Sequence, residues 1–493
     1  MSSIMNARAS IAVLPDDLIQ EIFELVVCSA FRIAGSNPHS QSECDSVCSG
    51  DISHIPIQLS HVCRYWRHLA LSYPKLWSYH NLSAHSSRFV TRQLLARSGN
   101  SPLYAKIVGP RTVWESTEAL VRLALDLSLH AHRFAEVFIV HFLPETMKEV
   151  LAPFATPAPN LRYLVVDAEV LIDHRALFLG WMPSLREICI SNVRMPWPPL
   201  SNLCRLELLV PMPPSFPELY KTMEQSPQLE VLSLVFDVLS SSFEPFSAPR
   251  IELPKLRKLS LSSLNSHSSG VLLLLSHLAF PATTEVKIHL PVHATRHLSD
   301  LCPSLQSIAS RIEDLDLQYS SSYGENNIFM QSTSSPFRLW WCWEGMLGNP
   351  ASLDHMGLAA AAFPSLRSLA VRVYSFDTYI VKWAEVLKHA PSIEHLRIDF
   401  QSFRDVTARC LLHGLTDDTD GSVNCPKLSH LELLRFTDHD ADLWPVVLRA
   451  MTIRKSQGAP VRFLEVTARR PLEFALADSM RCVVDKFIFH RKD

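Results

Sequence analysis

A short cassette recurs along most of this 493-residue chain and limits what the chain can fold into. It consists of a proline, any residue, a leucine or isoleucine, two residues, an apolar residue, one residue and a second apolar residue. Seven copies are Pro159–Val166, Pro183–Ile190, Pro227–Leu234, Pro254–Leu261, Pro364–Val371, Pro391–Ile398 and Pro426–Leu433. The prolines are 27 residues apart from Pro227 to Pro254 and from Pro364 to Pro391, and 24 apart from Pro159 to Pro183. This period predicts a repeat architecture rather than one compact core.

Each cassette is expected to form a β-strand whose alternate apolar residues point into the core. Candidate helices lie between the cassettes, for example at residues 217–225 and 379–390. One such repeat cannot bury its own apolar face, so neighbouring repeats must stack. The predicted fold class is therefore α/β, and residues 100–493 resemble a leucine-rich repeat solenoid, whose repeats span about 20–29 residues.

Polar residues between and just after the cassette leucines are the candidate substrate-binding residues, because the leucines themselves are expected to be core. On a solenoid these positions line the concave face. The candidates are Asp167, Asp316, Gln318, Arg372, Arg397, Asp399 and Glu432. Their chemistry is mixed, so it does not indicate a class of ligand.

The period is interrupted between Pro303 and Pro364, where we expect an irregular insertion at about residues 318–350. A polar low-complexity stretch, 320–336, is followed by three tryptophans within four residues, at positions 340, 341 and 343. Insertions in repeat proteins often lie near the binding surface, so Trp341 is a further substrate-binding candidate. The same tryptophans could equally fill the interior of the array.

Two amphipathic helices are predicted near the N-terminus. The first begins at Leu14-Pro15, and its apolar stripe is Leu14, Leu18, Ile22 and Leu25. Proline suits the first helical turn, where its missing N–H would have no partner in any case. The second helix is predicted over residues 57–70, with one apolar face formed by Leu59, Val62, Cys63, Trp66 and Leu69. So small a module cannot bury all of this surface against itself, which indicates a partner interface.

The pattern LPxxLxxxIF, followed by LSxVCRxWRxLALxxPxLW, resembles the F-box and most closely its variant common in basidiomycete fungi. Residues 94–103 are also similar to that variant, so the resemblance covers about residues 14–110. It implies a helical module, here residues 1–95 with a loop insertion at about 28–56, that docks on a Skp1-like adaptor and through it on a cullin. The adaptor contacts implied by position are Leu14, Pro15, Leu18, Ile22, Phe23, Val62, Cys63, Trp66, Leu69, Leu76 and Trp77. Some of these residues must instead form the core of the module.

The composition argues against several other classes of protein. A net charge of −3 gives no basic field that would attract nucleic acid. Glycines number only 13, and the sequence has no Gly-Lys-Ser/Thr phosphate loop, Gly-x-Ser-x-Gly elbow or His-Glu-x-x-His helix. We therefore expect no catalytic residues and no cofactor. Neither a secretion signal nor a membrane span is evident, so the expected location is the cytoplasm, the nucleus or both, with no membrane partner.

One cluster of metal-ligating residue types lies in the predicted loop. It contains His39, Cys44, Cys48 and His54, with Cys28 upstream. The spacing of Cys44 and Cys48 is permitted in zinc sites, but no matching second pair follows. Serine and aspartate dominate nearby, which favours a loosely ordered loop, and no metal site is predicted.

The leading hypothesis is the substrate-recognition subunit of an SCF-type cullin–RING ubiquitin ligase, with no bond chemistry of its own. The F-box-like helices would bind the adaptor, and the repeats would bind an unknown target protein. The alternative is a leucine-rich repeat scaffold without a ligase, in which the N-terminal helices cap the first repeat.

Overall fold

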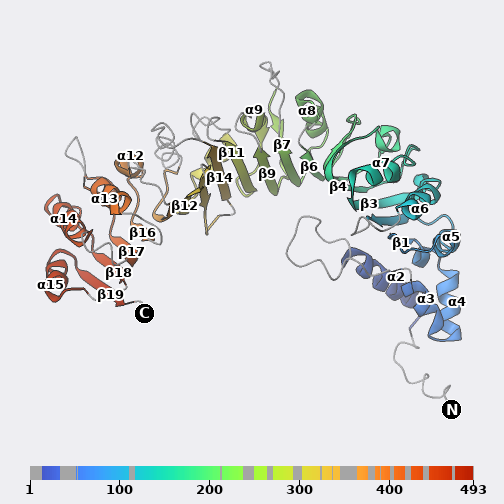
Figure 1. Ribbon diagram of the computed structural model, residues 1–493, viewed down its shortest axis with the longest axis horizontal. Coiled ribbons are helices and arrows are strands. Elements are labelled where there is room, and N and C mark those ends of the chain that lie inside the picture. Colours follow the sequence, from blue (N-terminus) through green and yellow to red (C-terminus); the bar gives the residue numbers. More distant parts are fainter. Residues whose placement is uncertain are drawn as a thin grey trace, which may run out of the picture. The chain divides into compact units, whose positions relative to one another are not determined.

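The computed structural model describes residues 14–33, 52, 54–109, 117–210, 214–236, 249–263, 270–291, 303–322, 325–335, 337–344, 363–375, 383–388, 390–399, 405–416, 423–436, 443–468 and 472–491. Over these residues the protein is a mixed α/β structure whose strands pair mostly in parallel (Figure 1). It divides into two compact units, residues 1–231 and 232–493. In the part of the chain described, no helix has the length and apolar character needed to cross a membrane.

The first unit begins with α2 (Asp16–Ile33), which starts directly after Pro15 as the sequence predicts. Two aspartates occupy its first turn, where they interact favourably with the positive end of the helix dipole. The buried stripe of α2 consists of Ile19, Phe23, Val27 and Phe31, at four-residue steps. The predicted apolar stripe of Leu14, Leu18, Ile22 and Leu25 lies on other sides of the helix, where Leu18 and Leu25 are exposed and Leu14 and Ile22 are half-buried. The sequence could not decide this, because α2 is apolar on more than one side.

The prediction of one continuous helix over residues 57–70 is wrong. The chain forms α3 (His54–His61) and α4 (Arg64–Ser72), followed by the 3₁₀ helix η2 (Pro74–Trp77). Cys63 separates the two helices with an extended backbone (φ −157°, ψ 172°), and its Sγ accepts a hydrogen bond from the N–H of Trp66 at 3.4 Å. Cys63 therefore caps the N-terminus of α4. The predicted loop at 28–56 is wrong at both ends, because residues 28–33 complete α2 and residues 54–56 begin α3. Of the residues between them, only Ile52 is described.

The sheet of the first unit consists of parallel strands in chain order. They are β1 (Tyr79–Leu82), β2 (Leu103–Val108), β3 (Phe134–Phe142), β4 (Tyr163–Asp173), β5 (Glu187–Arg194) and β6 (Arg205–Val210). The helices of the crossovers and of the segment after β6 are α5 (Arg88–Arg97), α6 (Glu118–Ser128), η3 (Ala131–Arg133), α7 (Pro144–Leu151), η4 (Leu177–Gly180) and α8 (Phe216–Glu224). The sheet already begins at Tyr79, so the predicted boundary at residues 95–100 falls inside the first crossover.

The two faces of this sheet carry different layers (Figure 1). On one face, alternate residues such as Leu103, Ile107 and Leu164 are fully buried, and α6 and α7 lie on that side. On the other face, Tyr79, Phe138, Val165 and Cys189 share one apolar core with the buried stripe of α2. The N-terminal helices and the first strands therefore fold around common apolar residues.

The second unit repeats the alternation of strands and helices. Its strands are β8 (Ile251–Glu252), β9 (Lys258–Ser263), β10 (Leu278–Ala279), β11 (Glu285–Pro291), β12 (Asp314–Ser322), β13 (Glu325–Gln331), β14 (Phe337–Glu344), β15 (Ser368–Ser375), β16 (His395–Asp399), β17 (His430–Phe436), β18 (Phe463–Ala468) and β19 (Lys486–Arg491), while β7 (Val231–Phe236) begins at the unit boundary. Its helices are α9 (Gly270–His277), α10 (Pro303–Ala309), α12 (Trp383–Lys388), α13 (Asp405–Gly414), α14 (Leu443–Ser456) and α15 (Phe474–Val483). Figure 1 shows α13, α14 and α15 along one side of their neighbouring strands.

The cassette prediction is confirmed strand by strand. Every one of the seven cassettes forms a strand that begins four residues after its proline, as β15 begins at Ser368 after Pro364. Leucines at one cassette position face one another across β15 to β18, where Leu369 is in register with Leu396, Leu431 and Leu464 in turn. All four are buried. The apolar positions of the cassette therefore form a continuous ladder in the core.

The segment predicted to be irregular contains regular strands. The end of β12, β13 and β14 occupy much of residues 318–350, and β13 pairs antiparallel with both β12 and β14. β14 also pairs in parallel with β11, and β12 with β15. The extra strands thus extend the sheet instead of leaving it. The first residues of β13, Glu325, Asn326 and Asn327, have weak strand propensity, and pairing on both edges of β13 overrides it.

Candidate functional site

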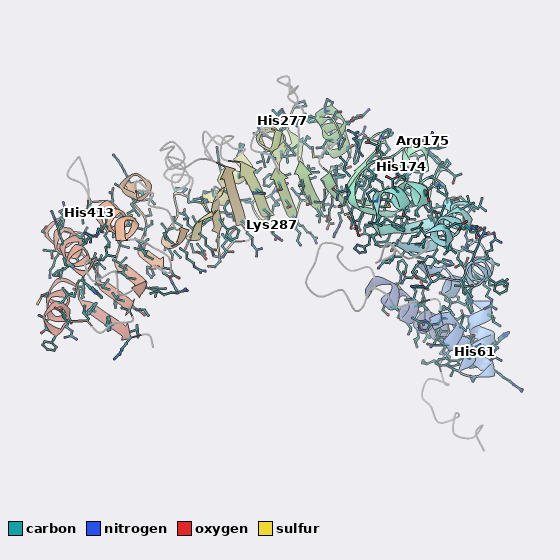
Figure 2. The ribbon with its side chains drawn as sticks, in the orientation of Figure 1. His61, His174, Arg175, His277, Lys287 and His413 are labelled. Carbon is teal, nitrogen blue, oxygen red and sulfur yellow. The ribbon has the colours of Figure 1, made fainter. Side chains whose placement is uncertain are left out.

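The helices α2 to α4 expose an apolar surface, the helical face. Its exposed members are Leu18 (43% exposed), Leu25 (62%), Val26 (42%), Val62 (60%), Tyr65 (41%) and Leu71 (51%). The hydroxyl of Tyr65 donates a hydrogen bond to Asp16, which places the start of α4 beside the start of α2. His61, also exposed, ends α3 next to this junction (Figure 2). Several large apolar side chains left exposed on neighbouring helices are consistent with a binding surface.

The predicted adaptor contacts divide into a surface group and a core group. Pro15, Leu18 and Val62 are exposed, and Leu14, Ile22, Cys63 and Trp66 are half-buried. The other four, Phe23, Leu69, Leu76 and Trp77, are buried in the core that the helices share with the sheet. Because these four side chains are buried, they cannot contact a partner in this structure, and we assign them to the core.

The half-buried Trp66 and the buried Trp77 hold the helices in place. The ring of Trp66 packs on Phe23 with 4.8 Å between centroids, which joins α4 to α2. The indole N–H of Trp77 donates to the carbonyl oxygen of Ala70 at 2.7 Å, so the buried ring has its polar atom satisfied. The guanidinium of Arg97 lies 4.7 Å from the centre of the Trp77 ring. These contacts fix the angle between the helices that carry the exposed residues.

Glu24 links α2 to η2 and to β1. Its carboxylate accepts a hydrogen bond from the Tyr73 hydroxyl at 2.5 Å and pairs with Lys75 Nζ at 2.7 Å, and the Tyr79 hydroxyl lies 3.4 Å away. Partial burial opposes ionisation of Glu24, but the bonds from Lys75 and Tyr73 outweigh it and hold its pKa below the usual value. The ionised carboxylate therefore stabilises the attachment of α2 to the sheet.

Phe31 anchors the far end of α2 on the sheet. Its ring packs edge-on against Tyr79 at 5.7 Å and Phe138 at 5.8 Å, between ring centroids. Tyr79 in turn stacks on Tyr104 at 4.5 Å. The aromatic side chains of β1, β2 and β3 thus form the seat for the helix, and α2 is held at both ends of its buried stripe.

The second surface is the polar face of β12 to β19. It consists of the strand residues that alternate with the buried leucines. Parallel register places them in rows, one of which runs from Asp316 through Ala370, Arg397, Glu432 and Glu465. The neighbouring row contains Gln318, Arg372 and Asp399. Six of the eight predicted substrate-binding residues therefore lie on one face of one sheet.

Ion pairs connect the strands of the polar face. Arg372 pairs with Asp316 at 3.0 Å, and Arg397 pairs with Glu432 at 3.4 Å. Arg435, which the sequence analysis missed, pairs with the buried Asp399 at 3.1 Å. The acids are 6–27% exposed, while the three arginines are 39–55% exposed. The arginines are therefore the more accessible partners of these ion pairs, and they can donate hydrogen bonds to another protein.

Histidines and a second glutamate extend the polar face towards β19. His430 lies between the rings of His395 and Phe463, with centroid distances of 5.1 and 5.7 Å. Glu465 lies next to Glu432 in register, and His490 Nε2 is 3.1 Å from Glu465 Oε1. His395, His430 and Glu465 were not among the predicted residues, although each occupies an alternating position of a strand in the predicted array. β19 has no cassette of its own, so nothing in the sequence pointed to His490.

The remaining predicted residues do not join this face. Asp167 lies on β4 in the first unit, in register with Val140 and Ser191. Trp341 belongs to β14, where its backbone pairs with Leu290 and Ile328, but its side chain lies outside the described residues. Of the discounted zinc ligands, His39, Cys44 and Cys48 lie outside them as well.

No protein-family model matches this sequence, and no curated protein matches it either.

Proposed function

We propose that this chain is a protein-binding subunit that recruits a target to a cullin–RING ubiquitin ligase. In this account the helical face binds a Skp1-like adaptor, and the polar face of β12 to β19 binds the target protein. The chain contributes proximity: it raises the effective concentration of the target near the ubiquitin-loaded enzyme.

The exposed apolar side chains of the helical face carry the proposal. Leu18 and Val62 belong to the pattern that resembles the F-box, and both are about half exposed. Their neighbours Phe23, Leu69 and Trp77 are buried, so the core of these helices is complete without them. Apolar side chains that a folded core leaves in water, on helices fixed by buried contacts, are typical of a protein interface.

We further propose that the strand and helix repeats form a leucine-rich repeat solenoid. Three features support this proposal: the period of 24–27 residues, the parallel pairing of successive cassette strands, and the ladder of buried leucines. Successive helices also contact one another, as α12, α13, α14 and α15 do. Repeats that bury their apolar faces only against neighbours give this arrangement.

The polar face suits the role of a target-binding surface for a chemical reason. It presents three half-exposed arginines, Arg372, Arg397 and Arg435, beside glutamates and histidines. The arginines can exchange their internal ion pairs for contacts with a partner. Arginine is enriched in protein interfaces.

A second candidate function is a scaffold without a ligase. The packing of α2 on β1 to β3 favours it, because Phe31, Tyr79 and Phe138 share one core and the helices thus cover apolar strand residues. Repeat arrays require such a cap. Capping and adaptor binding use different sides of α2, so the buried stripe can serve one and the exposed residues the other.

Co-expression with a tagged Skp1-like adaptor tests the ligase proposal. The full chain should co-purify with the adaptor, and a cullin added to the pair should join the complex. Leu18→Asp with Val62→Asp should abolish co-purification without unfolding the protein, because both side chains are exposed. Leu129→Asp is the matched control, since Leu129 is exposed in the first unit away from these helices. Absence of a complex with the unchanged chain would reject the ligase and leave the scaffold.

A further inference from the structure

The strands β17 and β18 bring together one histidine and two glutamates of the polar face, His430, Glu432 and Glu465. One possible ligand atom from each of His430, Glu432 and Glu465 lies within 4.8 Å of those of the other two. The three side chains are 27–31% exposed, while the Nε2 atom of His430 is itself buried. Within the described part of the chain, this is the one group of three such side chains close enough to share an ion.

The gap between His430 and Glu432 has the size of a metal-bridged pair. Nε2 of His430 is 3.7 Å from Oε1 of Glu432, too far for a hydrogen bond. This buried nitrogen has no hydrogen-bond partner among the described residues. Two ligands at zinc distances of about 2.0–2.2 Å in a tetrahedral site lie roughly 3.4 Å apart. A small closing movement of Glu432 would therefore allow both atoms to bind one ion.

The surrounding residues hold the ligand atoms in place. Stacking between His395 and Phe463 fixes the plane of the His430 ring. Arg397 Nε lies 3.4 Å from Oε2 of Glu432, which leaves the other oxygen turned towards His430. His490 Nε2 approaches Glu465 at 3.1 Å and orients that carboxylate in the same way. Outer contacts of this kind position metal ligands and tune affinity in known metal sites.

We infer that His430, Glu432 and Glu465 form a binding site for a divalent transition metal of the zinc class. An imidazole nitrogen with carboxylate oxygens suits zinc, copper or nickel, whereas calcium and magnesium take oxygen ligands. Two carboxylates supply negative charge that the positive charge of Arg397 only partly offsets. Three protein ligands leave a coordination position for water or for a side chain of a bound protein. The inference stands independently of adaptor binding, because it uses none of the residues of α2 to α4.

Titration calorimetry of the chelator-treated full chain with ZnCl2 tests this site. Zinc should bind with a dissociation constant in the micromolar range or below, and His430→Gln and Glu465→Gln should each weaken that binding at least tenfold. His413→Gln is the matched control, because His413 is an exposed histidine on α13 (Figure 2). Cysteines and histidines elsewhere in the chain can also bind zinc. The quantity that tests the site is therefore the difference in zinc affinity between the ligand variants and the control.

A second readout separates loss of the site from loss of the fold. Cobalt(II) in place of zinc should give visible absorption bands that disappear in Glu465→Gln, whose side chain is accessible and not needed for the core. Circular dichroism should show that this variant stays folded. The inference is overturned if the unchanged chain binds no zinc, if both ligand variants bind it as tightly as the control, or if calcium competes equally at this site.

Discussion

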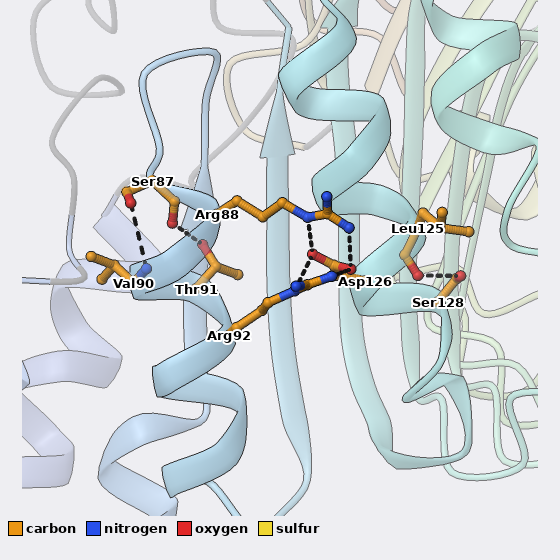
Figure 3. Close-up of polar contacts among 8 residues, drawn as sticks. All are labelled: Ser87, Arg88, Val90, Thr91, Arg92, Leu125, Asp126 and Ser128. Carbon is orange, nitrogen blue, oxygen red and sulfur yellow. Dashed lines mark hydrogen bonds and ion pairs between the residues drawn. The ribbon is translucent and has the colours of Figure 1, made fainter.

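Arg88 on α5 and Asp126 on α6 form a two-point ion pair, with 2.6 Å from Nε to Oδ2 and 2.9 Å from Nη2 to Oδ1 (Figure 3). Arg92, one turn further along α5, makes a second two-point pair with the same carboxylate. Hydrogen bonds from Arg88, and then from Arg92, hold the pKa of Asp126 well below its usual range although burial opposes this. Asp126 therefore joins two neighbouring helices of the first unit.

Asp126→Asn should destabilise the first unit because it removes charge-assisted hydrogen bonds from Arg88 and Arg92. The expected loss is only about 1–2 kcal/mol, because both arginines are partly exposed and solvent screens the ion pairs. The pKa of Asp126 is lower in the folded protein than in the unfolded chain, where it is near 4. The stabilisation by the ionised carboxylate is therefore fully present above about pH 4 and declines as the pH falls below that value. Urea unfolding at pH 7 and pH 3 should show the difference between variant and wild type shrinking at the lower pH. Asp173→Asn, which removes an exposed pair with Arg194, should change little; equal losses in both variants would contradict this account.

His80 on β1 should make the first unit sensitive to acid. It is fully buried, its ring nitrogens have no hydrogen-bond partner among the described residues, and burial together with nearby Arg133 lowers its pKa to about 3. The unfolded chain binds this proton near pH 6.5, so stability falls as pH drops from about 6.5 towards 3. One such group contributes up to about 1.4 kcal/mol per pH unit in that window.

His80→Leu should remove this contribution. The free energy of unfolding, measured in urea at pH 7, 5.5 and 4, should decline less steeply in the variant than in wild type. Parallel declines would show that His80 is protonated in the folded state or is not the group responsible.

Gly109 directly follows β2, at a point where no side chain fits. A Cβ at this position would lie 1.9 Å from the carbonyl oxygen of His141. Gly109→Ala should therefore cost at least about 3 kcal/mol, because backbone atoms must move. Gly458→Ala is the contrasting variant: its φ of +78° strains an alanine, but nothing lies within 4 Å, so about 1–2 kcal/mol is expected. Thermal unfolding of both variants should show the larger loss of stability in Gly109→Ala. A larger loss in Gly458→Ala would contradict this prediction.

Arg454 on α14 fixes the loop that leads into β17. It is fully buried, and its guanidinium donates to the carbonyl oxygens of Leu415, Asn424 and Cys425 at 2.7–3.0 Å. Arg454→Met should cost about 3 kcal/mol or more, because three buried acceptors lose their donor. Arg449→Met, on the same helix but exposed, should have little effect. Similar unfolding midpoints for the two variants in urea would argue against this role.

The sequence predicted the strands of the array well, because the cassette combines a turn-forming proline with apolar residues that alternate. Leu369, Leu396 and Leu431 occupy the positions that this pattern assigns to the core. Strands without a cassette, such as β1, β13 and β19, were missed because pairing with neighbours defines them more than their own residues do. Long-range pairing of this kind leaves no periodic signal in the sequence.

The candidate surfaces were predicted in part for the same reason. Alternation along the strands placed Arg372, Arg397 and Glu432 on one face, and the structure brings them together. Which stripe of α2 is buried could not be predicted, because Ile19 and Leu18 are equally apolar and only packing against the sheet distinguishes them. The break at Cys63 was missed because its neighbours on both sides continue a helical pattern.

The affinity of the full chain for a purified Skp1-like adaptor tests the central proposal most directly. Calorimetry should give a dissociation constant in the micromolar range or tighter. Leu18→Ala with Val62→Ala should weaken it at least 30-fold, because two exposed apolar contacts of about 1–2 kcal/mol each are lost. Trp66 is a poorer probe, since its packing on Phe23 would be lost as well. Leu129→Ala should bind as wild type does. Binding that is absent in wild type, or equal in all three proteins, would contradict the proposal that the helical face recruits the adaptor.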